Sequence, residues 1–154
     1  EQIEHPIIRE AFKQLGVNGH GEVPVMSELP SRTGLGSSGT FTVGLYNALM
    51  KYLEINGERE LKIAVVSPEH LAYMAYELEH DILKRPIGHQ DPLIASLGGV
   101  RVFRVNKDGI VMHRELMWSR AYALEEHLSL FYTRIRRQSM DILRKQQSNE
   151  KYLD

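Results

Sequence analysis

No cysteine occurs among the 154 residues of this chain, which excludes disulfides, thiolate metal sites and cysteine nucleophiles. No apolar run approaches the roughly 20 residues that a membrane-spanning helix needs. The formal net charge is −1, so bulk electrostatics gives no reason to expect a nucleic acid or a membrane surface as partner. The chain also lacks an initiator methionine and a signal peptide, and we expect a processed or truncated, cytoplasmic protein.

Two other patterns argue against further classes of site. The seven histidines are scattered without the spacing that places two ligands on one helix face, so we expect no zinc site. Basic residues recur between positions 134 and 145, but aromatic residues are not interleaved with them. This pattern is typical of a solvated helix face and does not favour nucleic-acid binding.

Helical periodicity and end signals predict several helices. Pro6 suits the first turn of one helix, and Gly16 ends it. Ser67 is the expected cap of another helix, with Pro68 at its first position, and this helix should run to about Lys84. The predicted helices are residues 6–15, 41–53, 68–84 and 134–147.

Short apolar runs and turn signals also predict strands. The predicted helices and strands together indicate an α+β fold. Asp108-Gly109 marks the turn between two of these strands. Gly44 either weakens the helix around it or permits close packing, and Trp118 is expected to be a packing residue. The predicted strands are residues 22–27, 100–105, 110–112 and 128–133.

The chain is organised around a glycine- and serine-rich loop that lies between an extended segment and an apolar helix. Gly34, Gly36 and Gly39 are interleaved with Ser37 and Ser38. A loop with so few Cβ atoms can turn its N–H groups towards one point, where the N-terminal N–H groups of the following helix join them. This arrangement is typical of a phosphate cradle, although a flexible connection has the same composition.

The three glycines also match the dinucleotide fingerprint G-x-G-x-x-G. That fingerprint needs a tight strand-to-helix turn and an acid about 20 residues further on, at a strand end. Position 59 is Arg59, and the nearest acids lie in a polar connection. A P-loop of the G-x-x-x-x-G-K-[ST] type is excluded, because no lysine follows the glycines.

Two carboxylates are candidate functional groups. Glu79 falls at the edge of the apolar face of its predicted helix, either at the solvent boundary or leaning inward. A buried carboxylate would need a partner, and a metal ion is one candidate. Asp91 precedes Pro92 and is by itself an ordinary turn residue.

The order of these pieces resembles a known superfamily. Pro30-x-x-x-Gly34-Leu35-Gly36-Ser37-Ser38 resembles the second signature of the galactokinase, homoserine kinase, mevalonate kinase and phosphomevalonate kinase (GHMP) superfamily. Glu79, Gly88-His89-Gln90-Asp91 and Gly98-Gly99 resemble its E…G-x-x-D…G-G region. The resemblance covers about residues 3–146. It is strongest to the branch of D-glycero-D-manno-heptose phosphate kinases and fucose kinases.

This resemblance implies a role for each matching residue. Gly34, Leu35, Gly36, Ser37 and Ser38 would wrap the ATP phosphates, Ser38 and Glu79 would hold Mg²⁺, Asp91 would orient or deprotonate a sugar hydroxyl, and Arg137 would steady an anionic substrate. These residue types suit phosphoryl transfer, which depends mainly on positioning and charge neutralisation.

The resemblance further implies a left-handed β-α-β, ribosomal-protein-like domain. We expect residues 1–127 to form part of the N-terminal, nucleotide-binding domain of such a kinase, and 128–154 to begin its C-terminal domain. The two terminal signatures of the family are missing, so the chain resembles the central half of such a kinase. The expected partners are a small-molecule sugar or sugar phosphate, and missing polypeptide segments or a second copy of the chain in a homo-oligomer. The expected function is ATP- and Mg²⁺-dependent phosphorylation of a sugar or sugar phosphate. A non-catalytic binding module and an NAD-binding module are the alternatives.

Overall fold

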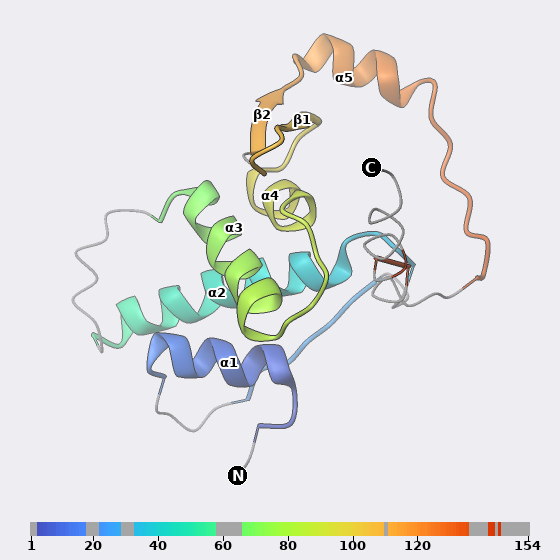
Figure 1. Cartoon of the computed structure of the whole chain (residues 1–154). Coiled ribbons are helices and arrows are strands. Elements are labelled where there is room, and N and C mark those ends of the chain that lie inside the picture. Colours follow the sequence, from blue (N-terminus) through green and yellow to red (C-terminus); the bar gives the residue numbers. More distant parts are fainter. Residues whose placement is uncertain are drawn as a thin grey trace.

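The computed structural model describes residues 3–17, 22–28, 33–57, 66–109 and 111–135, and positions 142, 143 and 145. Helices α1 to α4 pack into one body in Figure 1, and a β-hairpin and α5 extend away from it. This mixture of helices and a small sheet confirms the α+β class. In chain order the described elements are α1 (Pro6–Leu15), α2 (Ser37–Ile55), α3 (Pro68–Tyr76), the π-helix η1 (Glu77–Ile82), α4 (Gln90–Leu97), β1 (Arg101–Val105), β2 (Val111–Glu115) and α5 (Trp118–Glu125).

Helix α2 is the centre of the helical body, since α1, α3 and α4 all pack against it. Its apolar side chains are buried on several faces, which explains why it has a mostly apolar sequence. The hydroxyl group of Tyr46 donates a hydrogen bond to the side-chain oxygen of Gln14 and so ties α2 to α1. The buried apolar core consists of Ile7, Ala11 and Leu15 from α1, Val43, Leu45, Tyr46, Leu49, Met50 and Leu53 from α2, and Leu71, Ala75 and Leu78 from α3 and η1.

The end signals predicted for α1 and α3 are confirmed. Gly16 ends α1 with a left-handed φ of 68°, and the side chain of Ser67 accepts a hydrogen bond from the amide of His70 at 3.2 Å. Helix α2 begins at Ser37, four residues before the predicted start. Gly44 is exposed and a Cβ atom there would meet nothing within 4 Å, so this glycine does not serve close packing.

The third predicted helix differs in one respect, because its last turns are π-helical. Residues 77–82 form η1, whose wider turn changes which side chains face the core. Leu78 and Glu79 are both buried, whereas Ile82, which α-helical spacing places on the inward face, is 39% exposed. The π-helix therefore moves the acid Glu79 from the boundary of the apolar face into the interior.

The predicted hairpin is confirmed. Strands β1 and β2 pair antiparallel, with Phe103 opposite His113, around a turn at residues 106–109. This hairpin is the sheet among the described residues. The left-handed β-α-β arrangement therefore remains a prediction, as does the domain boundary at residue 127.

Four further predictions differ from the structure or fall outside it. The described segments 22–28 and 126–135 contain no strand, because a strand needs a neighbour to pair with and neither segment is paired there. Trp118 is 72% exposed and begins α5, a helix that was not predicted. Most of the predicted helix 134–147 lies outside the described residues.

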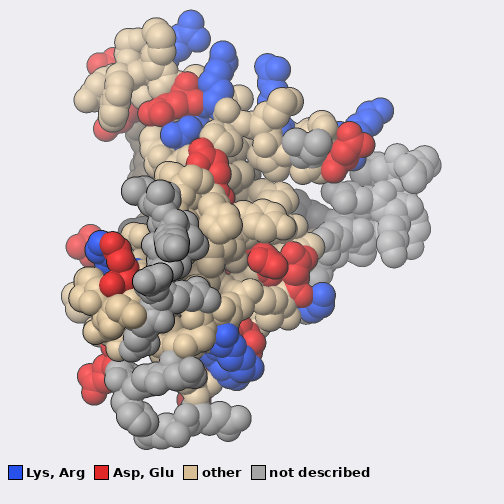
Figure 2. Space-filling view, turned by 90° about the vertical axis from the view of Figure 1, so that its left-hand side faces the viewer, with Lys and Arg blue, Asp and Glu red and all other residues tan. Residues whose placement is uncertain are grey.

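No helix among the described residues is long and apolar enough to cross a membrane. Acidic and basic side chains are interspersed over the face drawn in Figure 2. This mixture of charges fits the near-zero net charge of the chain.

The π-helix makes a testable prediction about two apolar residues. Leu78→Ala should lower the free energy of unfolding by about 2–5 kcal/mol, because it empties a fully buried site. Ile82→Ala should cost less than about 1 kcal/mol, because that side chain is substantially exposed. Urea unfolding of both variants measures the difference. Equal losses would indicate that residues 77–82 form an ordinary α-helix in solution.

Candidate functional site

The N-terminus of α2 is open towards the glycine- and serine-rich loop. Gly34 and Gly36 have φ values of 79° and 68°, which only glycine adopts without strain. Helix α2 has no side-chain cap and no acidic residue in its first turn. Its first N–H groups lack helical acceptors, and the helix dipole adds partial positive charge there. The geometry suits an anion.

The start of α4 lies directly against this loop. A Cβ atom on Gly36 would come within 3.5 Å of an Asp91 carboxylate oxygen. One on Gly39 would lie 3.1 Å from the backbone nitrogen of Pro92 and 3.1 Å from the Asp91 Cβ atom. Two glycines therefore permit the N-termini of α2 and α4 to meet, and they bring Asp91 to the loop.

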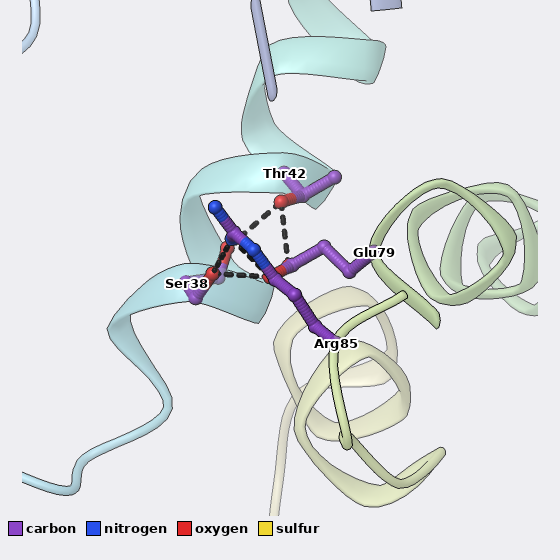
Figure 3. A network of polar contacts seen from close by, with 4 residues as sticks. All are labelled: Ser38, Thr42, Glu79 and Arg85. Atoms are coloured by element: carbon purple, nitrogen blue, oxygen red, sulfur yellow. Dashed lines mark hydrogen bonds and ion pairs between the residues drawn. The ribbon is translucent and has the colours of Figure 1, made fainter. Parts of the chain in front are cut away.

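A polar network joins α2 to η1 (Figure 3). The Ser38 hydroxyl donates a hydrogen bond to Glu79 Oε2, and the Thr42 hydroxyl lies 2.8 Å from Glu79 Oε1. Ser38 and Thr42 are one helical turn apart, so both hydroxyls lie on the same face of α2. Thr42 also lies 2.9 Å from the Ser38 carbonyl oxygen, and its single proton serves one acceptor at a time.

Arg85 completes this network. Its Nη1 atom lies 2.8 Å from Glu79 Oε2 and 3.2 Å from Ser38 Oγ. The Glu79 side chain is 1% exposed, so its negative charge is shielded from water and needs compensation. The guanidinium group and two hydroxyl groups provide it. The alternative that Glu79 lies at the solvent boundary is therefore wrong.

Asp91 has a different environment. It lies in the first turn of α4 and keeps an exposed face, so it is not merely a turn residue before Pro92. Partial burial raises the pKa of its carboxyl group above the ordinary value of 3.8, and the negative charge of Glu79 raises it further. The charge of Glu79 therefore acts on Asp91 across the site.

His89 precedes α4 and stacks on Tyr76, with 3.6 Å between the ring centroids. Burial lowers the pKa of His89 below its ordinary value of 6.5, so the ring is mainly neutral at pH 7. The rings of His89 and Tyr76 thus form an aromatic surface next to the start of α4.

The structure brings most of the predicted site residues together. Ser38 contacts Glu79 directly, and Asp91 lies against Gly36, while Leu35 is exposed in the loop. Arg137 lies outside the described residues. Ser37, the first residue of α2, is exposed beside Ser38.

Thr42 and Arg85 belong to the network but were not predicted. The spacing of Thr42, four residues after Ser38, could have indicated it. Arg85 carries no such signal, because its position depends on the π-helix and on the turn that follows.

Comparison with known proteins identifies the family of this chain. The family model described as GHMP kinases N terminal domain matches residues 5–99. The chain belongs to this family. The matched range includes the loop, Glu79 and Asp91, and it ends at the Gly98-Gly99 pair.

One curated relative is D-glycero-alpha-D-manno-heptose 7-phosphate kinase from Campylobacter jejuni, which is 34% identical to this GHMP family member over 119 residues. The alignment covers 75% of this chain and 32% of the relative. The chain thus spans about a third of the length of that protein. No solved structure matches the chain significantly. The resemblance to the heptose kinase branch is confirmed.

The dinucleotide alternative fits this structure poorly. A dinucleotide fingerprint needs a strand leading into its glycine turn, and the described residues 22–28 form none. The GHMP kinases N terminal domain model also spans these glycines.

Two glycines of α2 provide a matched test of the contact between α2 and α4. Gly44→Ala should stabilise the protein by about 1 kcal/mol, because it improves helix propensity in open space. Gly39→Ala gains the same propensity but forces a methyl group against the backbone of α4, and should destabilise by about 1–3 kcal/mol. Chemical denaturation compares the two. A stabilised Gly39→Ala variant would contradict the close approach.

The environment of Asp91 predicts a pH-dependent gain of stability on its removal. Because its pKa is higher in the folded than in the unfolded state, the charged form destabilises the fold at neutral pH. Asp91→Asn should therefore raise the unfolding temperature at pH 7, and the gain should shrink as the pH falls through the titration of Asp91. Asp108→Asn, in the hairpin turn, corrects for the change in net charge. A gain that does not vary with pH would contradict the assignment.

Proposed function

We propose that the protein containing this chain is a kinase that transfers the γ-phosphoryl group of Mg·ATP to a hydroxyl of a sugar or sugar phosphate. The observation that carries the proposal is the meeting of an open helix N-terminus, a Ser–Glu oxygen pair and an aspartate at one loop. The heptose 7-phosphate kinase relative supports a phosphorylated sugar as the substrate class.

In this proposal the loop residues 34–38 bind the nucleotide phosphates. The backbone N–H groups at the start of α2 donate to phosphate oxygens, and the glycines let the phosphates approach the backbone. The absence of an acid from the first turn of α2 keeps this end favourable for an anion.

Ser38 and Glu79 are the proposed ligands of Mg²⁺. Their side-chain oxygens are adjacent and are of the hard type that Mg²⁺ prefers. Among the described residues no group of three or more His, Asp or Glu side chains lies together as a metal cage. Mg²⁺ is commonly held by only one or two protein oxygen ligands, so Ser38 and Glu79 would suffice to hold it. When bound, Mg²⁺ would neutralise charge on the transferring phosphates.

Asp91 is the proposed catalytic base and orienting group. Its carboxylate lies at the loop, faces solvent on one side, and can accept the proton of a substrate hydroxyl. A raised pKa makes a carboxylate a better proton acceptor. Arg137 is proposed to steady an anionic substrate, and residues 128–154 are proposed to begin the C-terminal domain.

Asp91→Asn in the full-length protein tests the proposal. Turnover should fall by about 100-fold or more, because the variant cannot accept the hydroxyl proton. ATP affinity should stay nearly intact, because Asp91 is not proposed to touch the nucleotide. Coupled ATPase assays with heptose 7-phosphate as substrate give the rate, and calorimetry gives the affinity.

Asp108→Asn is the control, since it removes the same charge from the hairpin turn and should leave turnover unchanged. Equal losses of ATP affinity and turnover in Asp91→Asn would contradict the role of Asp91. Tight Mg·ATP binding by the wild-type protein without turnover on any phosphorylated sugar would favour the non-catalytic alternative.

A further inference from the structure

Arg85 occupies the two oxygens that are proposed to bind magnesium. Its Nη1 atom contacts both Glu79 Oε2, at 2.8 Å, and Ser38 Oγ, at 3.2 Å (Figure 3). A metal ion bound to these oxygens would lie next to the guanidinium group. Two positive charges at so short a distance repel each other strongly. The metal ion and Arg85 therefore cannot both bind Glu79 in this arrangement.

A turn after the π-helix places Arg85 beside Glu79. The π-helix ends at Ile82, and Lys84 follows with a left-handed φ of 53°, which is unusual for a residue with a side chain. The Arg85 amide then donates to the Glu79 carbonyl oxygen at 2.9 Å. This turn folds the chain back over the carboxylate, so local structure fixes the backbone position of Arg85.

Burial differs between the two partners of this ion pair. The Glu79 side chain is 1% exposed, whereas that of Arg85 is 22% exposed. Glu79 is thus fixed in the interior and must keep a positive partner. Arg85 has an open side, and a flexible side chain there can move while the carboxylate stays.

We propose that the Arg85 guanidinium group neutralises Glu79 in the absence of metal. When Mg²⁺ binds with the nucleotide, this group moves away from Glu79 and contacts the nucleotide phosphates instead. The open N-terminus of α2, which carries Ser38, is where those phosphates are proposed to lie. Arg85 is then a positioning residue that couples the binding of metal and nucleotide. This inference depends on the proposed kinase function.

The coupling has a definite sign. Metal alone must displace Arg85 from Glu79 without offering the guanidinium a new partner, so it binds weakly. With nucleotide present, phosphate oxygens receive the guanidinium, which forms charge-assisted, often bidentate, contacts with phosphate. Metal and nucleotide should therefore bind cooperatively, and the coupling must be equal in both directions.

The test uses Mn²⁺ as a paramagnetic probe in the full-length protein, titrated by electron paramagnetic resonance with and without the ATP analogue AMP-PNP. In Arg85→Gln, Mn²⁺ alone should bind about tenfold tighter than in wild type, and AMP-PNP should strengthen Mn²⁺ binding less. Lys84→Gln is the matched control. It removes the same charge one residue away, from an exposed side chain, and should leave both affinities unchanged.

Each other outcome has a defined meaning. Equal effects of Arg85→Gln and Lys84→Gln, or unchanged Mn²⁺ affinity in Arg85→Gln, would overturn the role of Arg85 while leaving the kinase proposal intact. Failure of the wild-type protein to bind Mn²⁺ even with AMP-PNP would overturn both.

If Arg85→Gln does not fold, Arg85→Lys replaces it. A single ammonium contact should hold Glu79 less firmly than the guanidinium, so Mn²⁺ alone should bind measurably tighter, and no gain would overturn the inference.

Discussion

The buried charge of Glu79 is the constraint on which the arrangement of this site depends. A carboxylate that is 1% exposed is stable only where charged or polar groups replace its water. The hydroxyl groups of Ser38 and Thr42 do so from 41 and 37 positions away in the sequence. Because a shift of either helix would break these bonds, the network fixes the start of α2 against η1.

The backbone features around the site follow from this constraint. Leu78 and Glu79 are both buried within the π-helix, and π-helical turns inside α-helices frequently occur at functional sites. The absence of a side chain on Gly39 then lets α4 approach, which sets Asp91 beside the same loop. A glycine and a change of helix type thus bring three chain segments to one place.

Local signals in the sequence predicted what depends on local physics. Proline at Pro6, the Ser67 cap and the Asp108-Gly109 turn act within a few residues, and the elements they mark are confirmed. The strand expected at 22–27 depends on a neighbour that periodicity cannot identify. The π-helix has no clear sequence pattern, so neither the full burial of Glu79 nor the contact with Arg85 could be predicted from spacing. The motif order indicated the family, while the partners of Glu79 required coordinates.

The site contains one region that favours an anion and another that favours a cation. The start of α2 has N–H groups without helical acceptors and no acid in its first turn, which favours an anion. Beside it, the negative charge of Glu79 disfavours the ionised form of Asp91 and raises its pKa, and a cation there would relieve this. Arg85 compensates the negative charge of Glu79, but not that of Asp91. It provides no anion for the N-terminus of α2. A phosphate that carries its own divalent cation satisfies both at once. For this reason we infer a metal–nucleotide complex as the ligand, in preference to a free metal ion or a free anion.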